Sequence, residues 1–282
     1  MVWVADAGAT KTDWAEVETL WHFSGEGLNV EVEGWPAARE KLLTSIQALR
    51  AAGKQIDVLH YYGPALHREE MREKMRRLLA ELLEVGVEQV WVYHDLLGAA
   101  RAAWGAQAGI VAILGTGSNC ALWDGRQILR QAGGHGYLLG DEGSGADIGK
   151  TFLSALLHQE VPTEVEEAFW KWNPFTEADT ALAWRTLVYA SKQPSALLGS
   201  IVPFLAQNQY HPWVKALVRN RVEVFIQRTW GPWASKFGVR YIGGVACAFE
   251  SLVREVTQDY GGQWGGVIPQ VWKALAAYHA GR

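Results

Sequence analysis

The sequence has very few cysteines and no long run of apolar residues. Its two cysteines, Cys120 and Cys247, are too few and too far apart for a disulfide framework or a spaced set of metal ligands. We interpret both as small core residues and expect a reducing compartment. The apolar runs fall short of the roughly 20 residues that cross a bilayer, and the first residues lack the apolar segment of a signal peptide. We therefore expect a cytoplasmic protein with no membrane partner.

The sequence also lacks an excess of basic residues. Its 26 lysines and arginines are outnumbered by 30 aspartates and glutamates, which gives a formal net charge of −4. Nucleic-acid-binding surfaces are basic, so we exclude nucleic acid as a partner. The one charge-dense stretch, residues 67–84, mixes both signs with apolar residues at helical spacing, which predicts an amphipathic surface helix that ends at Gly86. Tryptophan is abundant instead, with 15 residues, which we attribute to core packing or an oligomer interface, and we expect a homodimer.

The order of predicted elements restarts halfway along the chain. The first half predicts strands at 2–7, 12–17, 21–24, 56–62 and 87–93 and helices at 36–53, 67–85 and 96–104. The second half predicts a strand, a glycine-rich loop and a strand from Gly109, helices at 144–158, 246–260 and 269–278, and a strand at 239–243. Residues 163–231 are predicted to be mainly helical, with breaks at four prolines. This weak repeat predicts an α/β fold with two mixed sheets and helices on their faces. We place one domain at 1–106 and a second at 107–268, with a helical insertion, and expect the last helix, about 269–282, to pack back on the first.

A glycine-containing loop joins the first two predicted strands, with the sequence Asp6-Ala-Gly-Ala-Thr-Lys-Thr12. Backbone N–H groups, two hydroxyls and one ammonium within seven residues suit a polyphosphate. Asp6, just before the turn, could hold Mg²⁺ through water, because Mg²⁺ keeps several of its waters. The loop matches neither a P-loop nor a dinucleotide-binding fingerprint. An ordinary hairpin turn with an incidental lysine remains the alternative.

A second loop of the same kind, Gly115-Thr-Gly-Ser-Asn119, joins two predicted strands of the second half. By itself it could be a tight hairpin turn. Two such loops in one chain favour another interpretation, because independent hairpins rarely share this chemistry. They suggest two half-sites that close on one polyphosphate.

Three further segments carry candidate functional groups. Asp95 follows a predicted strand and precedes a helix, where it could act as a general base or as a helix N-cap. Residues 133–145 contain six glycines with Asp141 and Glu142, which suits recognition of sugar hydroxyls, or else forms a mobile loop with an acidic helix N-terminus. Gly243-Gly244 lies between a strand and a helix, where the backbone could approach a purine or a ribose.

These segments occur in the order found in N-acetylglucosamine kinases of the eukaryotic type, which the sequence resembles. Those kinases are similar to the BadF/BadG/BcrA/BcrD ATPases, within the superfamily of sugar kinases, Hsp70 and actin. The resemblance covers nearly the whole chain apart from residues 163–231, and it is greatest to bacterial members. It implies two ribonuclease H-like domains around an interdomain cleft that binds ATP, Mg²⁺ and an amino sugar.

The resemblance also implies a role for each matched residue. Asp95 would deprotonate the 6-hydroxyl of the sugar while the γ-phosphoryl group moves in line onto that oxygen, and Asp6 would position Mg²⁺ through water. The residues implied in ATP binding are Gly8, Ala9, Thr10, Lys11, Thr12, Gly115, Thr116, Gly117, Ser118, Gly243 and Gly244. Those implied in substrate binding are Asn29, Gly63, Asp95, Thr116, Asn119, Gly136, Tyr137 and Asp141.

Other functions remain open at this stage. Relatives of the BadF/BadG type are ATPases that activate a partner enzyme through an iron–sulfur cluster held by cysteines, but neither cysteine here looks placed for that. A sensor that binds a sugar without transferring phosphate is a further alternative. Within the kinase class, glucosamine or N-acetylmuramic acid could replace N-acetylglucosamine as the substrate.

Overall fold

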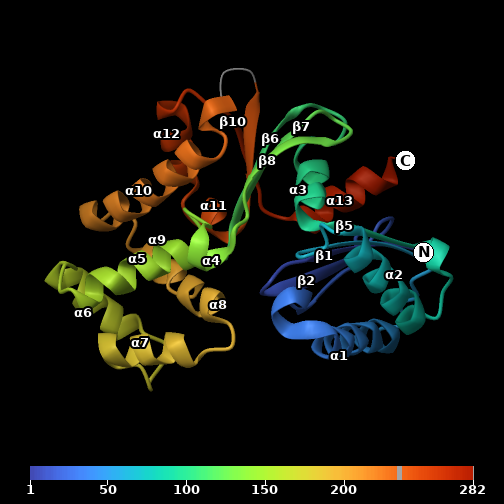
Figure 1. Cartoon of the computed structure of the whole chain (residues 1–282), viewed down its shortest axis with the longest axis horizontal. Helices are drawn as coiled ribbons and strands as arrows, with labels where there is room; N and C mark the ends of the chain where they lie inside the picture. The colour runs from blue at the N-terminus through green and yellow to red at the C-terminus, as the bar shows by residue number, and fades with distance from the viewer. Residues whose placement is uncertain (234–236, 282) are drawn as a thin grey trace. The chain divides into compact units, whose positions relative to one another are not determined.

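The computed structural model describes residues 1–233 and 237–281, and the chain divides into two compact units (Figure 1). The first unit contains Met1–Gln107, Trp123–Ile128 and the C-terminal segment from Gln270. The second contains Ala108–Leu122 and Leu129–Pro269. No helix of the described residues is long and apolar enough to span a membrane.

The first unit is built on a five-stranded mixed sheet with the order β3-β2-β1-β4-β5. Strands β1, β2 and β3 pair antiparallel, whereas β1, β4 and β5 pair parallel. The strands are β1 (Val2–Ala7), β2 (Lys11–Glu16), β3 (His22–Glu26), β4 (Val58–Gly63) and β5 (Val90–His94). The helices are α1 (Val30–Ala51), α2 (Glu69–Leu83), the short 3-10 helix η1 (Val87–Gln89), α3 (Asp95–Trp104) and α13 (Val271–Ala280).

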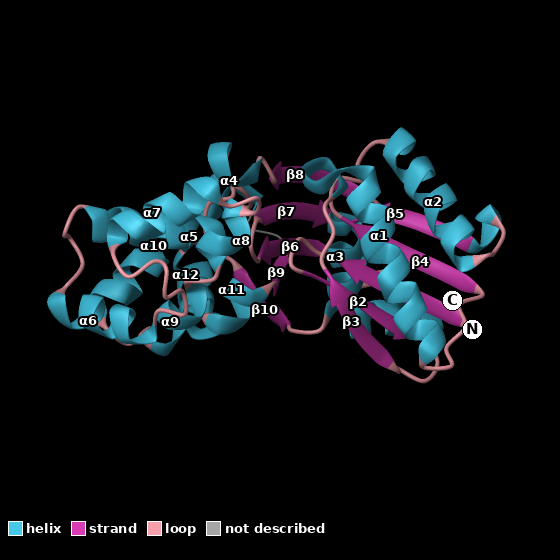
Figure 2. Cartoon of the chain, turned by 90° about the horizontal axis from the view of Figure 1, so that it is seen from below, coloured by secondary structure: helices cyan, strands magenta, loops and turns pink. Residues whose placement is uncertain are grey.

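Both faces of this sheet are covered by helices, with α1 and α2 on one side and α3 and α13 on the other (Figure 1), and Figure 2 looks onto the face that α1 and α2 cover. Successive side chains of a strand point to opposite faces, so Trp3 packs with α1 and α2 while its neighbour Val4 packs with Leu275 of α13. Gly98 lets α3 approach the sheet, because a Cβ there would lie 2.8 Å from the ring of Tyr62. A strand that is buried on both faces has a nearly continuous apolar sequence. Strand β1 could be predicted from the sequence for this reason.

The second unit repeats the same topology. Its sheet has the order β10-β9-β6-β7-β8, and β6, β9 and β10 run parallel. Counted from the first strand of each unit, both sheets have the order 3-2-1-4-5, so the predicted α/β fold with two ribonuclease H-like domains is confirmed. The strands are β6 (Gly109–Leu114), β7 (Ser118–Trp123), β8 (Ile128–Gly133), β9 (Gly238–Ile242) and β10 (Gln263–Ile268).

Helices fill the remainder of the second unit. Most of them lie between β8 and β9, where they form a large apolar core with the sheet. They are α4 (Gly136–Leu139), α5 (Gly145–Leu157), α6 (Thr163–Trp172), α7 (Ala181–Ala190), α8 (Pro194–Gly199), α9 (Val202–Gln207), α10 (Pro212–Arg228), η2 (Gly231–Trp233), α11 (Gly244–Ala248) and α12 (Glu250–Asp259).

Several local predictions were wrong. Strands β8 and β10 were not predicted, because both are edge strands with weak apolar alternation, and β10 contains a bulge. The helix predicted at 246–260 is two helices that meet at Phe249. Helix α2 ends at Glu84, which adopts a left-handed conformation (φ 62°), and not at Gly86. Cys247 is exposed on the short helix α11, so only Cys120 is a core residue.

Candidate functional site

The first glycine-containing loop is the turn between β1 and β2. The N–H of Gly8 donates to the carbonyl of Lys11 (2.8 Å), and the N–H of Leu28 donates to the carbonyl of Gly8 (2.9 Å). These bonds fix the base of the turn, while Ala9, Thr10 and Lys11 are exposed at its tip. The tip therefore presents backbone and side-chain donors to solvent on a rigid hairpin.

Gly27 supports this turn and was not singled out from the sequence. A Cβ at Gly27 would lie 2.4–2.5 Å from backbone atoms of Ala9 and Thr10, which is closer than any real contact. The segment before α1 can pass under the tip only because residue 27 has no side chain. The turn thus depends on a glycine 19 positions beyond Gly8, a relation that no local pattern reveals.

Lys11 is held by a buried carboxylate. Its Nζ lies 2.6 Å from Oδ2 of Asp13, while Oδ1 of Asp13 accepts from Ser24 Oγ (2.5 Å) and pairs with His22 Nε2 (2.9 Å). Burial opposes the charge of Asp13, but these three partners together hold the pKa of its carboxyl below the ordinary value. Any phosphate bound at the tip would share the Lys11 ammonium with Asp13.

Thr12 differs from the residues of the tip. Its side chain is buried, and its hydroxyl donates to the carbonyl of Glu26 (2.9 Å) across the β2–β3 pair. The hydroxyl therefore joins neighbouring strands, and it is Thr10 that stands at the exposed tip.

Asp6 lies among other carboxyl groups. It pairs with Asp13 across β1 and β2, and burial raises the pKa of Asp6 to about 7, with further contributions from the charges of Asp13 and Asp95. Lys11 opposes this shift. A cation would relieve this concentration of negative charge, so the site fits a hydrated Mg²⁺ that Asp6 contacts through water. Within the described ranges, no three His, Cys, Asp or Glu side chains are arranged to hold a metal directly.

Asp95 is the first residue of α3 and follows the carboxyl end of β5. Its Oδ1 accepts from the N–H of Leu96 (2.8 Å). The N-cap is His94 and not Asp95, because Nδ1 of His94 accepts from the N–H of Leu97 (3.3 Å). Burial raises the pKa of Asp95, and the backbone N–H groups and the nearby imidazole of His67 offset part of that rise. The carboxylate is thus held at a helix N-terminus with an enhanced affinity for a proton.

His94 and His67 were missed by the sequence analysis. Burial lowers the pKa of His94 to about 4, and the nearby Arg72, His67 and Arg101 add to the shift. His94 is therefore neutral near pH 7, as its role as a hydrogen-bond acceptor requires. The sequence signal was present, since His94 directly precedes the predicted base, whereas His67 is 28 positions away from Asp95.

The other two predicted residues of the first unit have clear structural roles. Gly63 pairs with His94 across β4 and β5, and a Cβ there would lie 2.8 Å from the ring of Tyr61. Asn29 is the N-cap of α1, where its Oδ1 accepts from the N–H of Glu31 (3.1 Å). Gly63 is thus brought next to the strand end that carries Asp95, while Asn29 begins the helix that follows β3.

The second glycine-containing loop joins β6 and β7. The N–H of Gly115 donates to the carbonyl of Gly117 (3.0 Å), which closes a tight turn. The carbonyls of Gly115 and Thr116 accept from the N–H groups of Gly145 (2.7 Å) and Ala146 (3.2 Å), at the start of α5. The loop is therefore held from outside by the first turn of α5.

Asp141 connects this loop with the glycine-rich segment before α5. Burial raises the pKa of Asp141, and hydrogen bonds from the N–H groups of Ser118 and Gly136 lower it in part. A Cβ at Gly117 would lie 2.9 Å from the Asp141 carboxylate. Four of the predicted site residues, Gly117, Ser118, Gly136 and Asp141, are thus brought together.

Tyr137 and Asn119 lie beside this group. Tyr137 packs partly against the core of the second unit, and its carbonyl accepts from Lys150 Nζ (3.3 Å). Oδ1 of Asn119 accepts from the N–H of Cys120 (2.9 Å) and from Gln131 Nε2 (3.3 Å). Both side chains are half-buried.

The Gly243-Gly244 turn touches the second glycine-containing loop. Because β6 and β9 run parallel, their carboxyl ends meet at one edge of the sheet. Gly243 has φ +110°, and a Cβ there would lie 2.4 Å from the carbonyl oxygen of Leu114 and 2.8 Å from the nitrogen of Gly115. Gly244 opens α11 with free space around it. The predicted adenosine turn and the predicted phosphate loop are therefore neighbours.

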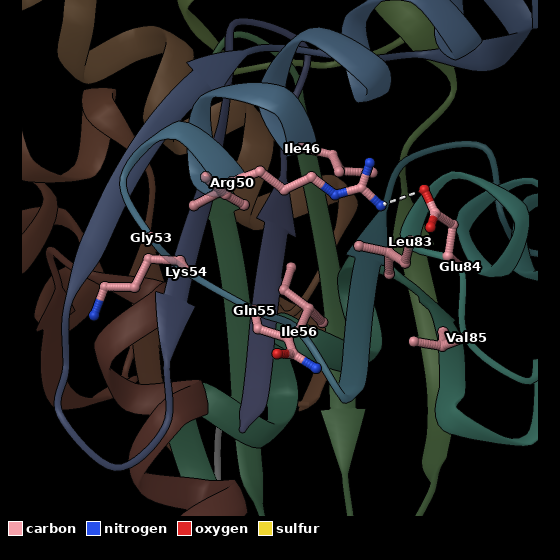
Figure 3. A pocket seen from close by; sticks show the side chains of 10 residues that line it. Ile46, Arg50, Gly53, Lys54, Gln55, Ile56, Leu83, Glu84 and Val85 are labelled. Carbon is pink, nitrogen blue, oxygen red and sulfur yellow. Dashed lines mark hydrogen bonds and ion pairs between the residues drawn. The ribbon is translucent and has the colours of Figure 1, made fainter.

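A cavity of about 450 Å³ in the first unit belongs to none of these residues (Figure 3). It lies where α1 and α2 end and the chain enters β4, at the end of that strand opposite to Gly63. Arg50 spans it to Glu84 (3.0 Å) and to the carbonyl of Leu82 (3.1 Å), so its main cation already ties α1 to the end of α2. We interpret this cavity as a gap between the ends of α1 and α2 and not as a ligand site.

Comparison with solved structures identifies the family. A protein from Porphyromonas gingivalis, described as a putative N-acetylglucosamine kinase, matches with a TM-score of 0.86 and 31% sequence identity over 100% of this chain and 99% of that one. The chain belongs to this family of sugar kinases. A second protein described in the same way, from Chromobacterium violaceum, shares the fold, with 21% sequence identity and a TM-score of 0.71 over 99% of this chain and 97% of that one.

A more distant structure shares the fold alone. It is a ROK family glucokinase from Streptomyces griseus in complex with glucose and AMPPNP, 14% identical with a TM-score of 0.58 over 98% of this chain and 97% of that one. No protein-family model matches the sequence, and neither does any curated protein. The family and the fold are therefore shown by the likeness to solved structures.

We predict that Gly27→Ala displaces the β1–β2 turn. The added methyl group would overlap the backbone of Ala9 and Thr10, so the turn or the segment before α1 must move. We expect ATP to bind at least about tenfold more weakly, since a shift of the order of 1 Å misaligns positioned groups. Calorimetric titration with AMPPNP measures this. Gly281→Ala is the matched control, because a Cβ there finds only an ordinary contact at 3.9 Å, and equal affinities in both variants would contradict the prediction.

We further predict that Asp6 makes the protein less stable as the pH rises. The folded protein holds the Asp6 proton up to about pH 7, while the unfolded chain releases it near its ordinary value of 3.8. The destabilisation is therefore absent below about pH 4 and complete above pH 7. Asp6→Asn removes it, so the variant should gain about 1–3 kcal/mol over the wild type at pH 8 relative to pH 4.

Urea denaturation without Mg²⁺ at the two pH values measures this difference. Asp57→Asn is the control, because the amino terminus lowers the pKa of Asp57, so this variant should show no such gain at pH 8. A gain for Asp6→Asn that is the same at pH 4 and pH 8 would show that the Asp6 carboxyl is not perturbed.

Proposed function

We propose that this protein is an ATP-dependent kinase that phosphorylates the 6-hydroxyl of an amino sugar, with N-acetylglucosamine as the preferred substrate. The observation that carries the proposal is that the parallel strands β1, β4 and β5 end at one edge of the first sheet, where Asp95 directly follows β5 and the β1–β2 turn follows β1. The full-length likeness to a protein described as a putative N-acetylglucosamine kinase supports the substrate.

In this proposal Asp95 removes the proton of the sugar 6-hydroxyl as that oxygen forms its bond to the γ-phosphorus. The bond from the γ-phosphorus to the β–γ bridging oxygen breaks, and ADP leaves. The proton stays on Asp95 until solvent takes it. The burial that raises the pKa of Asp95 makes it a better proton acceptor than an exposed aspartate, provided that it is ionised when the sugar binds.

The glycine-containing loops would position the phosphates and stabilise their charge. Phosphoryl transfer needs little covalent work from the protein, so positioning supplies most of the rate enhancement. Gly8–Thr12 would contribute from one unit, and Gly115–Ser118 with Gly243 and Gly244 from the other. Bound Mg²⁺ would neutralise phosphate charge next to Asp6.

The sugar would contact residues from both units. Asp141 offers a buried carboxylate for sugar hydroxyls, and Gly136 leaves the backbone open to a close approach. Gly63, next to the strand end that carries Asp95, is a further proposed contact. The remaining proposed contacts are Asn29, Asp95, Thr116, Asn119 and Tyr137. We also propose a cytoplasmic location and a homodimer.

We predict that Asp95→Asn lowers the turnover number at least about a hundredfold, the usual size of a general-base contribution. Its affinity for ATP should stay within about threefold, because the amide keeps the hydrogen bond from the N–H of Leu96. A coupled assay of ADP release and a binding titration measure the two quantities. Asp57→Asn, an exposed aspartate at the start of the first sheet, is the control and should leave both unchanged.

The same assay across a set of sugars tests the substrate. N-acetylglucosamine should give the highest kcat/KM among N-acetylglucosamine, glucosamine, N-acetylmuramic acid and glucose. Full activity of Asp95→Asn would refute the assignment of the base. ATP hydrolysis that no sugar stimulates would instead favour an ATPase that activates a partner enzyme.

A further inference from the structure

Arg221 of helix α10 forms an ion pair with the buried carboxylate of Asp147, at the end of the segment 141–147. Nε of Arg221 donates to Oδ2 of Asp147 over 2.7 Å, and the same oxygen accepts from the N–H of Gly143 (2.9 Å). The Asp147 side chain is only 6% exposed. The other nearby cation, Lys150, lies 3.9 Å from Oδ1 of Asp147 and is itself half exposed.

The segment from Asp141 to Asp147 holds the phosphate loop of the second unit. The N–H of Ser144 donates to the carbonyl of Asp141 (3.1 Å), while Gly145 and Ala146 donate to the carbonyls of Gly115 and Thr116. A displacement of this segment would therefore move the Asp141 carboxylate and the turn after β6 together.

The segment also packs closely on α10. Gly143 adopts φ +72°, and a Cβ there would lie 2.9 Å from Cβ of Phe225 and 3.2 Å from the carbonyl oxygen of Arg221. Two turns further along α10, Arg228 pairs with Glu142, directly next to Asp141. Helix α10 thus contacts the segment through its backbone, through apolar packing and through two arginines.

Asp147 needs a positive partner at this place. A buried carboxylate that loses its cation must be protonated, must recruit water or must move outward. Each of these would weaken the hydrogen bond from the N–H of Gly143 and loosen the residues on either side of it. The backbone N–H of Asp147 also donates to Oγ of the N-cap Ser144 (3.2 Å), so the first turn of α5 includes the same residue.

We infer that Arg221 is a positioning residue for the proposed phosphoryl transfer, which acts through Asp147 to hold Asp141 and the Gly115–Ser118 loop. This inference rests on the proposed kinase function. It also gives a role to the helical region 163–231, because α10 of that region would hold the segment 141–147 in place. The interaction joins residues 74 positions apart in the sequence.

The test compares Arg221→Met and Arg221→Lys with a control on the same helix. Arg219→Met removes an arginine two residues away that pairs with Glu223, Glu255 and Asp259, all of which lie outside residues 141–147. Kinetics are measured well below the unfolding temperature of each variant. Arg221→Met should lower kcat about tenfold and raise the KM for the sugar about tenfold, as misplaced groups do.

Arg221→Lys should recover part of both losses, because lysine restores the charge but not the directed Nε donor. Arg219→Met should match the wild type in kcat and KM even if it is less stable. Hydrogen exchange gives a second readout: peptides over 141–147 should exchange faster in Arg221→Met than in Arg219→Met.

If both Arg221 variants match Arg219→Met in kinetics and in exchange, the inference is overturned. Should Arg221→Met fail to fold, the comparison of Arg221→Lys with Arg219→Met decides it by the same two measurements. A wild-type protein that phosphorylates no amino sugar would defeat the proposed function, and the exchange comparison would still decide whether Arg221 braces the segment.

Discussion

The candidate site depends on two parallel strand pairs, one in each unit. Strand β1 pairs with β4, and β6 pairs with β9. This pairing brings the carboxyl ends of β1 and β4, and those of β6 and β9, to one edge of each sheet. Glycines then let backbones meet at those edges, as Gly243 does against Leu114 and Gly115. Ligands of open α/β sheets collect at such edges, so the strand order itself selects the place of the chemistry.

The edge at the carboxyl ends of β1 and β4 (the first edge) differs in its charges from the edge at the carboxyl ends of β6 and β9 (the second edge). Asp6, Asp13 and Asp95 concentrate negative charge in the first unit, with Lys11 as the cation next to Asp13. In the second unit Asp141 is satisfied by backbone N–H groups. We infer that the first edge is suited to a metal ion and proton transfer, and the second to fixed hydrogen bonds with phosphate and sugar oxygens.

Much of this arrangement was predictable from sequence, because small residues after an apolar strand leave a clear local pattern. Both loops, Gly243-Gly244 and the position of Asp95 could be found in that way. Long-range relations could not: Gly27 under the β1–β2 turn, His67 near Asp95 and Arg221 on Asp147 depend on residues that only folding brings together. The edge strands β8 and β10 were missed because their side chains are only partly buried, so their apolar alternation is weak.

We propose that both loops bind one triphosphate and that Asp95 deprotonates the sugar hydroxyl. A crystal structure of the protein with AMPPNP, Mg²⁺ and N-acetylglucosamine tests this most directly. We expect backbone N–H groups of Gly8–Lys11 and of Gly115–Ser118 within hydrogen-bond distance of the β- and γ-phosphates, and the sugar O6 within that distance of the Asp95 carboxylate. A nucleotide that touches only one loop, or an O6 turned away from Asp95, would contradict the proposal.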